Sequence, residues 1–392
     1  MKDAYQPECG RMAAVQTPVI PVIADLIAEN PGTISLGQGV VYYGPPRAAL
    51  ERLAEISAGD TIHRYGHTSG LPALRQLISG KLKTENHIDI DNGSNLTVTA
   101  GSNMAFINAL FAITRTGDEV ILCVPYYFNH EMAIRMLSCE PVLVQTDADY
   151  LPDINRLRHA ITEKTRAIVT ITPNNPSGVI YPESLLTDIN ALCHDHQLYH
   201  ICDEAYEYFT YEGRQHFSAG SLENAAEHTI SLYSLSKAYG FASWRIGYMV
   251  YPEHLSSAIY KAQDTNLICP PVASQYAAMG ALAEGAGYCH RKLEVIQEVR
   301  QIILEQLESV QSLCTVSRSE GAFYLIIKLA ADLDDMVVAR TLIRQHRIAV
   351  LPGSTFGLQN GCYFRVAYGA LDKNNAREGI RRLTNGLTDI MQ

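Results

Sequence analysis

The sequence predicts an α/β protein with a mostly parallel sheet, because strand and helix patterns alternate through the middle of the chain. Between about residues 97 and 250, short runs rich in β-branched residues alternate with amphipathic stretches. The runs are apolar on both faces, which is typical of parallel strands covered by helices on each side. Seven strands are expected, at Leu96–Thr99, Glu119–Val124, Pro141–Gln145, Ala167–Thr172, Leu198–Cys202, Thr229–Ser234 and Ile246–Val250.

The stretches between these strands have the spacing of apolar residues that predicts amphipathic helices. Together with the strands they define a large domain, expected over residues 45–270. The predicted helices cover Asn103–Thr114, Phe128–Leu137, Asp153–Ile161 and Glu183–Asp195.

A change of pattern after Pro270-Pro271 predicts a second, smaller α+β domain over residues 271–392. The N-terminal segment, residues 1–44, contains one helical stretch near Ile20–Glu29 and is too short to bury a core alone, so we expect it to pack on the small domain. The small domain should contain helices at Val272–Glu284, Arg291–Ser309 and Asn374–Leu387, and strands at Ala322–Lys328 and Ile348–Leu351.

Composition excludes several classes of protein. The 31 Lys and Arg against 41 Asp and Glu give a net charge of −10, and no basic run occurs, so neither a nucleic acid nor a membrane surface is an expected partner. The 9 cysteines are scattered without a Cys-x-x-Cys pair, which is typical of reduced thiols in a cytoplasmic protein. Neither a secretory signal nor an apolar run of membrane-spanning length is visible.

The most informative stretch surrounds Lys237, directly after the predicted strand Thr229–Ser234. Ser234 and Ser236 precede the lysine, and Arg245 lies eight residues beyond it. Hydroxyls and a guanidinium bind a phosphate ester well, because the guanidinium forms forked hydrogen bonds. A lone lysine after a strand would be a surface residue. The combination therefore indicates a phosphorylated ligand held beside an amine.

Several other motifs accompany this stretch, and together they resemble one family. They are Tyr-Gly at 65–66 with Gly-Leu-Pro-Ala-Leu-Arg at 70–75, Thr-Ala-Gly-Ser at 99–102, Asn-Asn-Pro-Ser-Gly at 174–178, Asp-Glu-Ala-Tyr at 203–206 and Phe-Arg-Val at 364–366. With Ser-x-Ser-Lys at 234–237, the sequence resembles the fold-type I, class I/II aminotransferases that use pyridoxal 5'-phosphate. The resemblance covers roughly residues 30–370 and implies the aspartate aminotransferase-like fold.

The resemblance implies a role for each central residue. Lys237 would form the Schiff base with the cofactor aldehyde and then act as the base that moves the substrate proton. Asp203 would keep the pyridine nitrogen protonated, which makes the ring an electron sink. Asn175 and Tyr206 would bind the cofactor's phenolic oxygen, and Tyr127 would stack on the ring. Asn175 and Tyr127 would also border the substrate.

Phosphate binding is expected from residues at a predicted helix start and around the lysine turn. Backbone N–H groups at a helix N-terminus are suited to an anion. The resemblance also implies that Tyr65 reaches the phosphate of a neighbouring subunit, in a homodimer with shared active sites. The expected phosphate-binding residues are Gly101, Ser102, Asn103, Ser234, Ser236 and Arg245.

Arg365 and Gly39 are expected to bind the substrate α-carboxylate, again by resemblance. Some aspartate-using relatives have a lysine where this chain has Asn103, and a partner-subunit segment corresponding to Ile268-Cys269 is apolar here. Residues 40–43 could add an apolar and aromatic wall. We therefore expect a neutral amino donor, apolar or aromatic, with 2-oxoglutarate or pyruvate as the acceptor.

Three alternatives stay open at this stage. The same carbanion chemistry could serve a C–S β-lyase or an aspartate aminotransferase, and a non-catalytic regulator could retain the cofactor fold.

His196 and His200 have the four-residue spacing of a metal site. A predicted helix ends before the second histidine, so we expect a solvated helix end and no metal.

Overall fold

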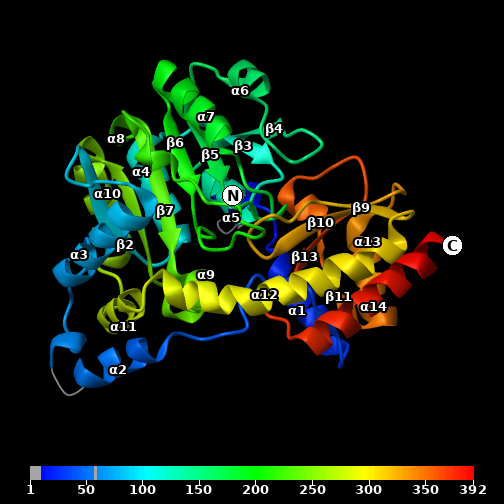
Figure 1. The fold of residues 1–392 in the computed structure, drawn as a ribbon. Coiled ribbons are helices and arrows are strands. Elements are labelled where there is room, and N and C mark those ends of the chain that lie inside the picture. The colour runs from blue at the N-terminus through cyan, green and yellow to red at the C-terminus, as the bar shows by residue number, and fades with distance from the viewer. Residues whose placement is uncertain (1–9, 57–59) are drawn as a thin grey trace, which may run out of the picture.

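The computed structural model describes residues 10–56 and 60–392; the predictions on Cys9 and the first residues lie outside this range. A large seven-stranded sheet and a smaller four-stranded sheet organise the chain (Figure 1). The strands are β1 (Ile34–Ser35), β2 (Ser94–Thr99), β3 (Glu119–Val124), β4 (Glu140–Gln145), β5 (Thr165–Ile171), β6 (Tyr199–Asp203), β7 (Thr229–Ser234), β8 (Gly247–Pro252), β9 (Cys314–Val316), β10 (Tyr324–Leu329), β11 (Ile348–Ala349), β12 (Leu351–Pro352) and β13 (Tyr363–Ala367).

The large sheet has the strand order β2-β8-β7-β6-β5-β3-β4. Its strands run parallel except β8, which is antiparallel to both β2 and β7. All seven strands of the described sheet correspond to the seven predicted runs, so the predicted mostly parallel α/β fold is confirmed. The carboxyl ends of β2, β3, β5, β6 and β7 meet at one edge.

Strand β3 shows how the sheet is covered on both faces. Val120 and Leu122 pack with the helices α4 (Ser102–Ile113) and α5 (Phe128–Met136). Ile121 points to the opposite face, toward α6 (Ile154–Ala160) and α7 (Glu183–Asp195). Successive side chains on a strand alternate between faces, so a run that is apolar throughout requires helices on both sides.

The remaining helices include several that periodicity did not predict. The predicted helix at 291–309 begins earlier, because Gly285, at a φ of 64°, ends the preceding turn. Six α-helices of the described chain were not predicted, at Arg47–Ile56, Pro72–Lys81, Ala225–His228, Leu235–Ala238, Ser256–Leu267 and Asp335–Thr341. The bounds are α1 (Val19–Glu29), α2 (Arg47–Ile56), α3 (Pro72–Lys81), α8 (Ala225–His228), α9 (Leu235–Ala238), α10 (Ser256–Leu267), α11 (Val272–Ala283), α12 (Ala286–Leu307), α13 (Asp335–Thr341) and α14 (Lys373–Met391).

The smaller sheet is antiparallel, in the order β12-β13-β10-β9. The predicted strand at 348–351 was wrong in one respect: it divides into β11, which pairs with β1, and β12, which pairs with β13. Helix α12 runs from below the large sheet to the side of α14 (Figure 1). Because β1 pairs with β11, the N-terminal segment contacts the C-terminal part of the chain. The domain boundaries at residues 44 and 270 stay a prediction.

Two further observations concern the cysteines and the helices of the described residues. Eight cysteines are unpaired there, and all except the half-buried Cys269 are buried. Within residues 10–56 and 60–392, no helix combines the length and the apolar character that crossing a membrane requires.

Candidate active site

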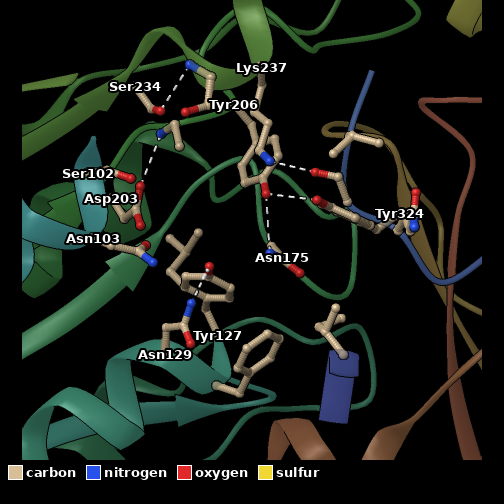
Figure 2. A pocket seen from close by; sticks show the side chains of 18 of the residues that line it. Ser102, Asn103, Tyr127, Asn129, Asn175, Asp203, Tyr206, Ser234, Lys237 and Tyr324 are labelled. Carbon is tan, nitrogen blue, oxygen red and sulfur yellow. Dashed lines mark hydrogen bonds between the residues drawn. The ribbon is translucent and has the colours of Figure 1, made fainter. Parts of the chain in front are cut away.

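A cavity of about 570 Å³ lies at the edge where the parallel strands end, between the large sheet and the small one. Open α/β sheets bind ligands at this edge because the loops that follow the strands meet there. Figure 2 shows Lys237 entering from above, with Asp203 and Ser234 on one side and Tyr324 on the other. The predicted residues that line the cavity are Gly39, Ser102, Asn103, Tyr127, Asn175, Asp203, Tyr206, Ser234, Ser236, Lys237, Arg245 and Arg365.

Lys237 lies in the short helix α9, directly after β7. Its Nζ donates a hydrogen bond to the carbonyl of Gly39. Burial, followed by the positive charges of Arg365 and Arg245, lowers the pKa of Lys237 to about 8, and Asp203 partly opposes this shift. The amine is therefore far more often neutral near physiological pH than an exposed lysine, and only a neutral amine is a nucleophile.

Asp203 is the last residue of β6, and its carboxylate lies in the cavity. Its Oδ2 is 3.1 Å from Nε2 of His130, a buried histidine on α5. The backbone N–H of Ala205 donates to Oδ1 at 3.1 Å. These two contacts fix the orientation of the carboxylate. The sequence did not indicate His130, because a single histidine on a helix is usually a packed residue.

Asn175 and Tyr206 meet deep in the cavity, as predicted for partners of one ligand atom. Asn175 Nδ2 donates to the hydroxyl of Tyr206 at 3.2 Å. The Tyr206 hydroxyl is also 2.8 Å from that of Tyr324, which lies on β10 (Figure 2). Burial raises the pKa of Tyr206 well above its ordinary value, so its hydroxyl stays protonated.

Gly101 and Arg245 form an anion cradle at the start of α4. Gly101 has a φ of 80°, and a Cβ there would lie 2.3 Å from Nη2 of Arg245, so no side chain fits. Arg245 Nη1 is 3.4 Å from Oγ of Ser236, and the Ser234 hydroxyl accepts the N–H of Ser236 at 3.1 Å. First-turn N–H groups of a helix have no intrahelical acceptors. The cradle can therefore bind a phosphate.

Arg365, on β13, is 2% exposed. Its Nη1 donates to Oδ1 of Asn175 at 3.0 Å, and its Nη2 donates to the carbonyl of Gly37 at 2.6 Å. The guanidinium lies 4.5 Å from the ring centre of Tyr324 and 5.0 Å from that of Phe356. Within the described residues no carboxylate pairs with Arg365, so its charge is available to an anionic substrate.

Tyr127 lies between β3 and α5 and forms part of the cavity wall. Asn129 Nδ2 donates to its hydroxyl at 2.7 Å. Its ring is at an angle of 82° to that of His130, with the centres 5.2 Å apart. The ring is therefore held in one orientation by contacts at its edge and its hydroxyl.

Two predicted residues do not line the cavity. Gly101 supports the cradle from behind, whereas Tyr65 is 80% exposed and lies beside Pro270 in a separate surface depression. Within this chain Tyr65 therefore does not reach the cradle. Sequence reasoning missed His130 and Tyr324, since neither belongs to a short motif.

The rival histidine cluster does not form a joint site. His196 follows the end of α7, and His194 is exposed. His200 lies in β6, as the predicted strand Leu198–Cys202 placed it, and is buried there with Nε2 3.0 Å from Oγ1 of Thr170. Among the residues that the structure describes, no group of three His, Cys, Asp or Glu side chains is arranged to hold a metal ion.

The fold and the site define an enzyme that holds an anionic ligand beside a reactive lysine. The family described as aminotransferase class I and II matches residues 31–383. An aromatic aminotransferase, ISS1, of Arabidopsis thaliana is 36% identical over 97% of this chain and 96% of its own length. An aspartate aminotransferase of Pyrococcus abyssi is 30% identical, over 91% of this chain and 92% of its own.

Solved structures agree with these relatives. An aspartate aminotransferase of Thermus thermophilus, a single mutant, superposes with a TM-score of 0.89, at 28% identity, over 98% of this chain and 100% of its own. The chain belongs to the class I and II aminotransferase family, whose members use pyridoxal phosphate, and it is an amino-acid transaminase. The lyase and regulator alternatives are not favoured.

Proposed function

We propose that this chain binds pyridoxal 5'-phosphate in the cavity and transfers amino groups from neutral, apolar or aromatic L-amino acids to a 2-oxo acid. The residues present fit this cofactor: Gly101 lets the Arg245 guanidinium lie directly against the start of α4, where free N–H groups can bind a phosphate, and Asp203 supplies a fixed carboxylate for the pyridine nitrogen. When bound, the cofactor supplies an electron sink for the carbanion at the substrate Cα. Lys237 is its covalent attachment point.

The side chains then divide the work of transamination. Arg365 binds the α-carboxylate and orients the donor, with Asn175 beside it. Lys237 Nζ takes the proton from Cα, because its lowered pKa leaves the amine able to act as a base. With the cofactor bound, Tyr206 and Asn175 would donate hydrogen bonds to its phenolic oxygen, and Tyr127 would pack against its ring. Asp203 would keep the ring nitrogen protonated.

The cations that line the cavity carry the proposal on substrate class. Within the described lining, Lys237, Arg245 and Arg365 are the positively charged side chains, and each has a role already given. Among the groups that this chain contributes, a second carboxylate would find no cationic partner, and burying it unpaired costs several kcal/mol. The remaining wall includes Pro18, Ile20, Phe128 and Val40.

Four other arginines, from elsewhere in the chain, are possible partners for a distal carboxylate. Arg47 pairs with Glu51 on the surface, and Arg135 pairs with Glu131. Arg11 is 3.5 Å from the carbonyl of Met136, and Arg64 borders the separate depression beside Tyr65. None of the four lines the described cavity, which supports a neutral donor.

The half-reaction with the amino donor alone, followed by the visible absorbance of the holoenzyme, tests this substrate class without an acceptor that carries a second carboxylate. The second-order rate constants for phenylalanine and methionine should exceed that for aspartate by about tenfold or more, because an unpaired buried carboxylate is costly. Alanine, which has the same charge but a small side chain, is the matched control for the apolar wall. A clear preference for aspartate would overturn the proposal.

We also propose a cytoplasmic homodimer in which Tyr65 reaches the cradle of the partner subunit. The exposure of Tyr65 in the single chain supports this arrangement. Mixing inactive Tyr65→Phe and Lys237→Ala chains should restore some activity, since one site of the hybrid is intact. A mixture that exchanges subunits by mass spectrometry and stays inactive would argue against shared sites.

A further inference from the structure

Tyr324 contacts three parts of the active site at once, although it belongs to none of the motifs. Its hydroxyl is 2.8 Å from that of Tyr206. Its ring lies beside the guanidinium of Arg365, 4.5 Å from ring centre to Cζ. A Cβ on Gly39 would lie 2.5 Å from the Tyr324 hydroxyl. The backbone of Gly39, whose carbonyl accepts a hydrogen bond from the Lys237 amine, therefore lies directly against this tyrosine.

We propose that Tyr324 is a positioning residue that acts on both halves of the site, through its hydroxyl on Tyr206 and through its ring on Arg365. The inference rests on the proposed function, in which Tyr206 binds the cofactor's phenolic oxygen and Arg365 the substrate carboxylate. The two effects can be tested separately, because the effect on Tyr206 depends on the hydroxyl of Tyr324 and the effect on Arg365 depends on its aromatic ring.

A proton inventory gives the direction of the hydroxyl effect. Tyr206 has one hydroxyl proton, which it needs for the phenolic oxygen of the cofactor. It must therefore accept from its two other neighbours, Asn175 Nδ2 at 3.2 Å and the Tyr324 hydroxyl at 2.8 Å. Both donations make Tyr206 a stronger donor, because hydrogen bonds in a chain polarise one another.

The ring effect follows from how Arg365 is held. Nη1 and Nη2 are fixed by Asn175 and the Gly37 carbonyl, whereas Nε has no partner among the described residues. Cation–π contact with Tyr324, at 4.5 Å, and with Phe356, at 5.0 Å, therefore sets the plane of the guanidinium. The orientation of that plane determines whether two N–H groups of Arg365 can donate to the same carboxylate.

Other polar and charged groups also lie near the hydroxyls of Tyr206 and Tyr324. Arg365 and Tyr127 lie near both tyrosines, and Tyr368 lies near Tyr324. Tyr368 donates to or accepts from Ser319 at 2.8 Å and does not line the cavity. Tyr368→Phe is the control: it removes a buried hydroxyl that is linked to the Tyr324 backbone carbonyl through Ser319, but that makes no hydrogen bond to Tyr206 or Arg365 in the described chain.

The first arm of the test is a spectroscopic pH titration of the holoenzyme without substrate. A donor on the phenolic oxygen draws off the negative charge that retains the neighbouring proton, so losing a donor raises the pH midpoint of the visible absorption change. Tyr324→Phe should raise this midpoint by roughly half a unit to one unit. Tyr206→Phe should raise it further, and adding Tyr324→Phe to that variant should change nothing more.

The second arm measures KM for the amino donor and the oxo acid. Tyr324→Phe retains the ring and should leave both KM values within about twofold. Tyr324→Leu removes the ring and should raise both by about 3- to 30-fold, the range of a cation–π contact. Tyr368→Phe should alter neither the midpoint nor KM.

The outcomes separate this inference from the proposed function beneath it. A shift in Tyr206→Phe without one in Tyr324→Phe would overturn the hydroxyl effect alone, and equal KM values in the Phe and Leu variants would overturn the ring effect. An unchanged midpoint in Tyr206→Phe would instead contradict the proposed role of Tyr206. Because Tyr324→Phe preserves the packing of the ring, a folding failure in Tyr324→Leu leaves the first arm decisive.

Discussion

The two sides of the cavity are built in different ways. The side proposed for the cofactor consists of residues at the ends of adjacent strands in one sheet, such as Asp203 after β6 and Lys237 after β7. The side proposed for the substrate carboxylate joins segments from opposite ends of the chain, since Arg365 donates to the carbonyl of Gly37. One side depends on the order of strands, the other on the docking of the N-terminal segment.

The difference teaches where chemistry and specificity can change independently. Neighbouring parallel strands fix the positions of Asn175, Asp203 and Lys237 relative to one another, so this side is rigid. The substrate side includes Pro18 and Ile20 from outside the sheets, and these can differ without disturbing the cofactor side. Variants on the two sides should therefore fail in different measurements.

The largest expected effect is on the cofactor side. Lys237→Ala should lower kcat by about 10⁴-fold or more, because the covalent attachment point and the proton carrier are lost together. Phosphate and ring contacts should still retain some cofactor, which absorbance after gel filtration would detect. Lys83→Ala, at an exposed ion pair with Asp89, is the control and should behave as the unchanged protein.

Asp203→Asn should lower kcat by roughly 10²- to 10³-fold while the thermal unfolding midpoint changes little. The amide has nearly the same shape, but it cannot hold the ring nitrogen protonated. Kinetics and calorimetry on the same samples give both values. Near-normal turnover would show that another group stabilises the carbanion.

A paired substitution contrasts the two sides directly. Arg365→Lys should raise KM for donor and acceptor by about 10- to 100-fold, because an ammonium cannot form the paired hydrogen bonds to a carboxylate. Arg245→Lys should instead weaken cofactor retention, which equilibrium dialysis measures. If both variants altered the same quantity, the division between the two sides would be wrong.

The sequence alone could predict the cofactor side because its motifs are local. A strand, a turn and a few residues place Ser234, Ser236 and Lys237 together, and the strand order brings Asp203 beside them. Contacts between segments far apart in the sequence could not be worked out this way, on either side of the cavity. His130 and Tyr324 look like ordinary packed residues in the sequence, and their partners Asp203 and Arg365 lie 73 and 41 positions away along the chain. The helices α2 and α3 were missed because they are short, and short helices depend on tertiary packing more than on local sequence.

The smallest expected effect is a pH dependence of the cofactor-free protein. Because the pKa of Lys237 is lowered to about 8, the fraction of neutral amine rises as pH increases through that value. The rate of cofactor uptake by reaction with Lys237 should rise with this fraction, with a midpoint near pH 8. That midpoint should lie well below the midpoint for the free ε-amine of Nα-acetyllysine in the same buffers. Arg245→Gln should move the midpoint upward, because one nearby positive charge is removed.

Borohydride reduction of the holoenzyme, followed by peptide mapping, tests the central claim most directly. Reduction fixes the cofactor to the amine that carries it. The account predicts one labelled peptide, with the modification on Lys237, and loss of that label in Lys237→Ala. Label on any other lysine, at equal occupancy, would contradict the assignment of this cavity as the active site.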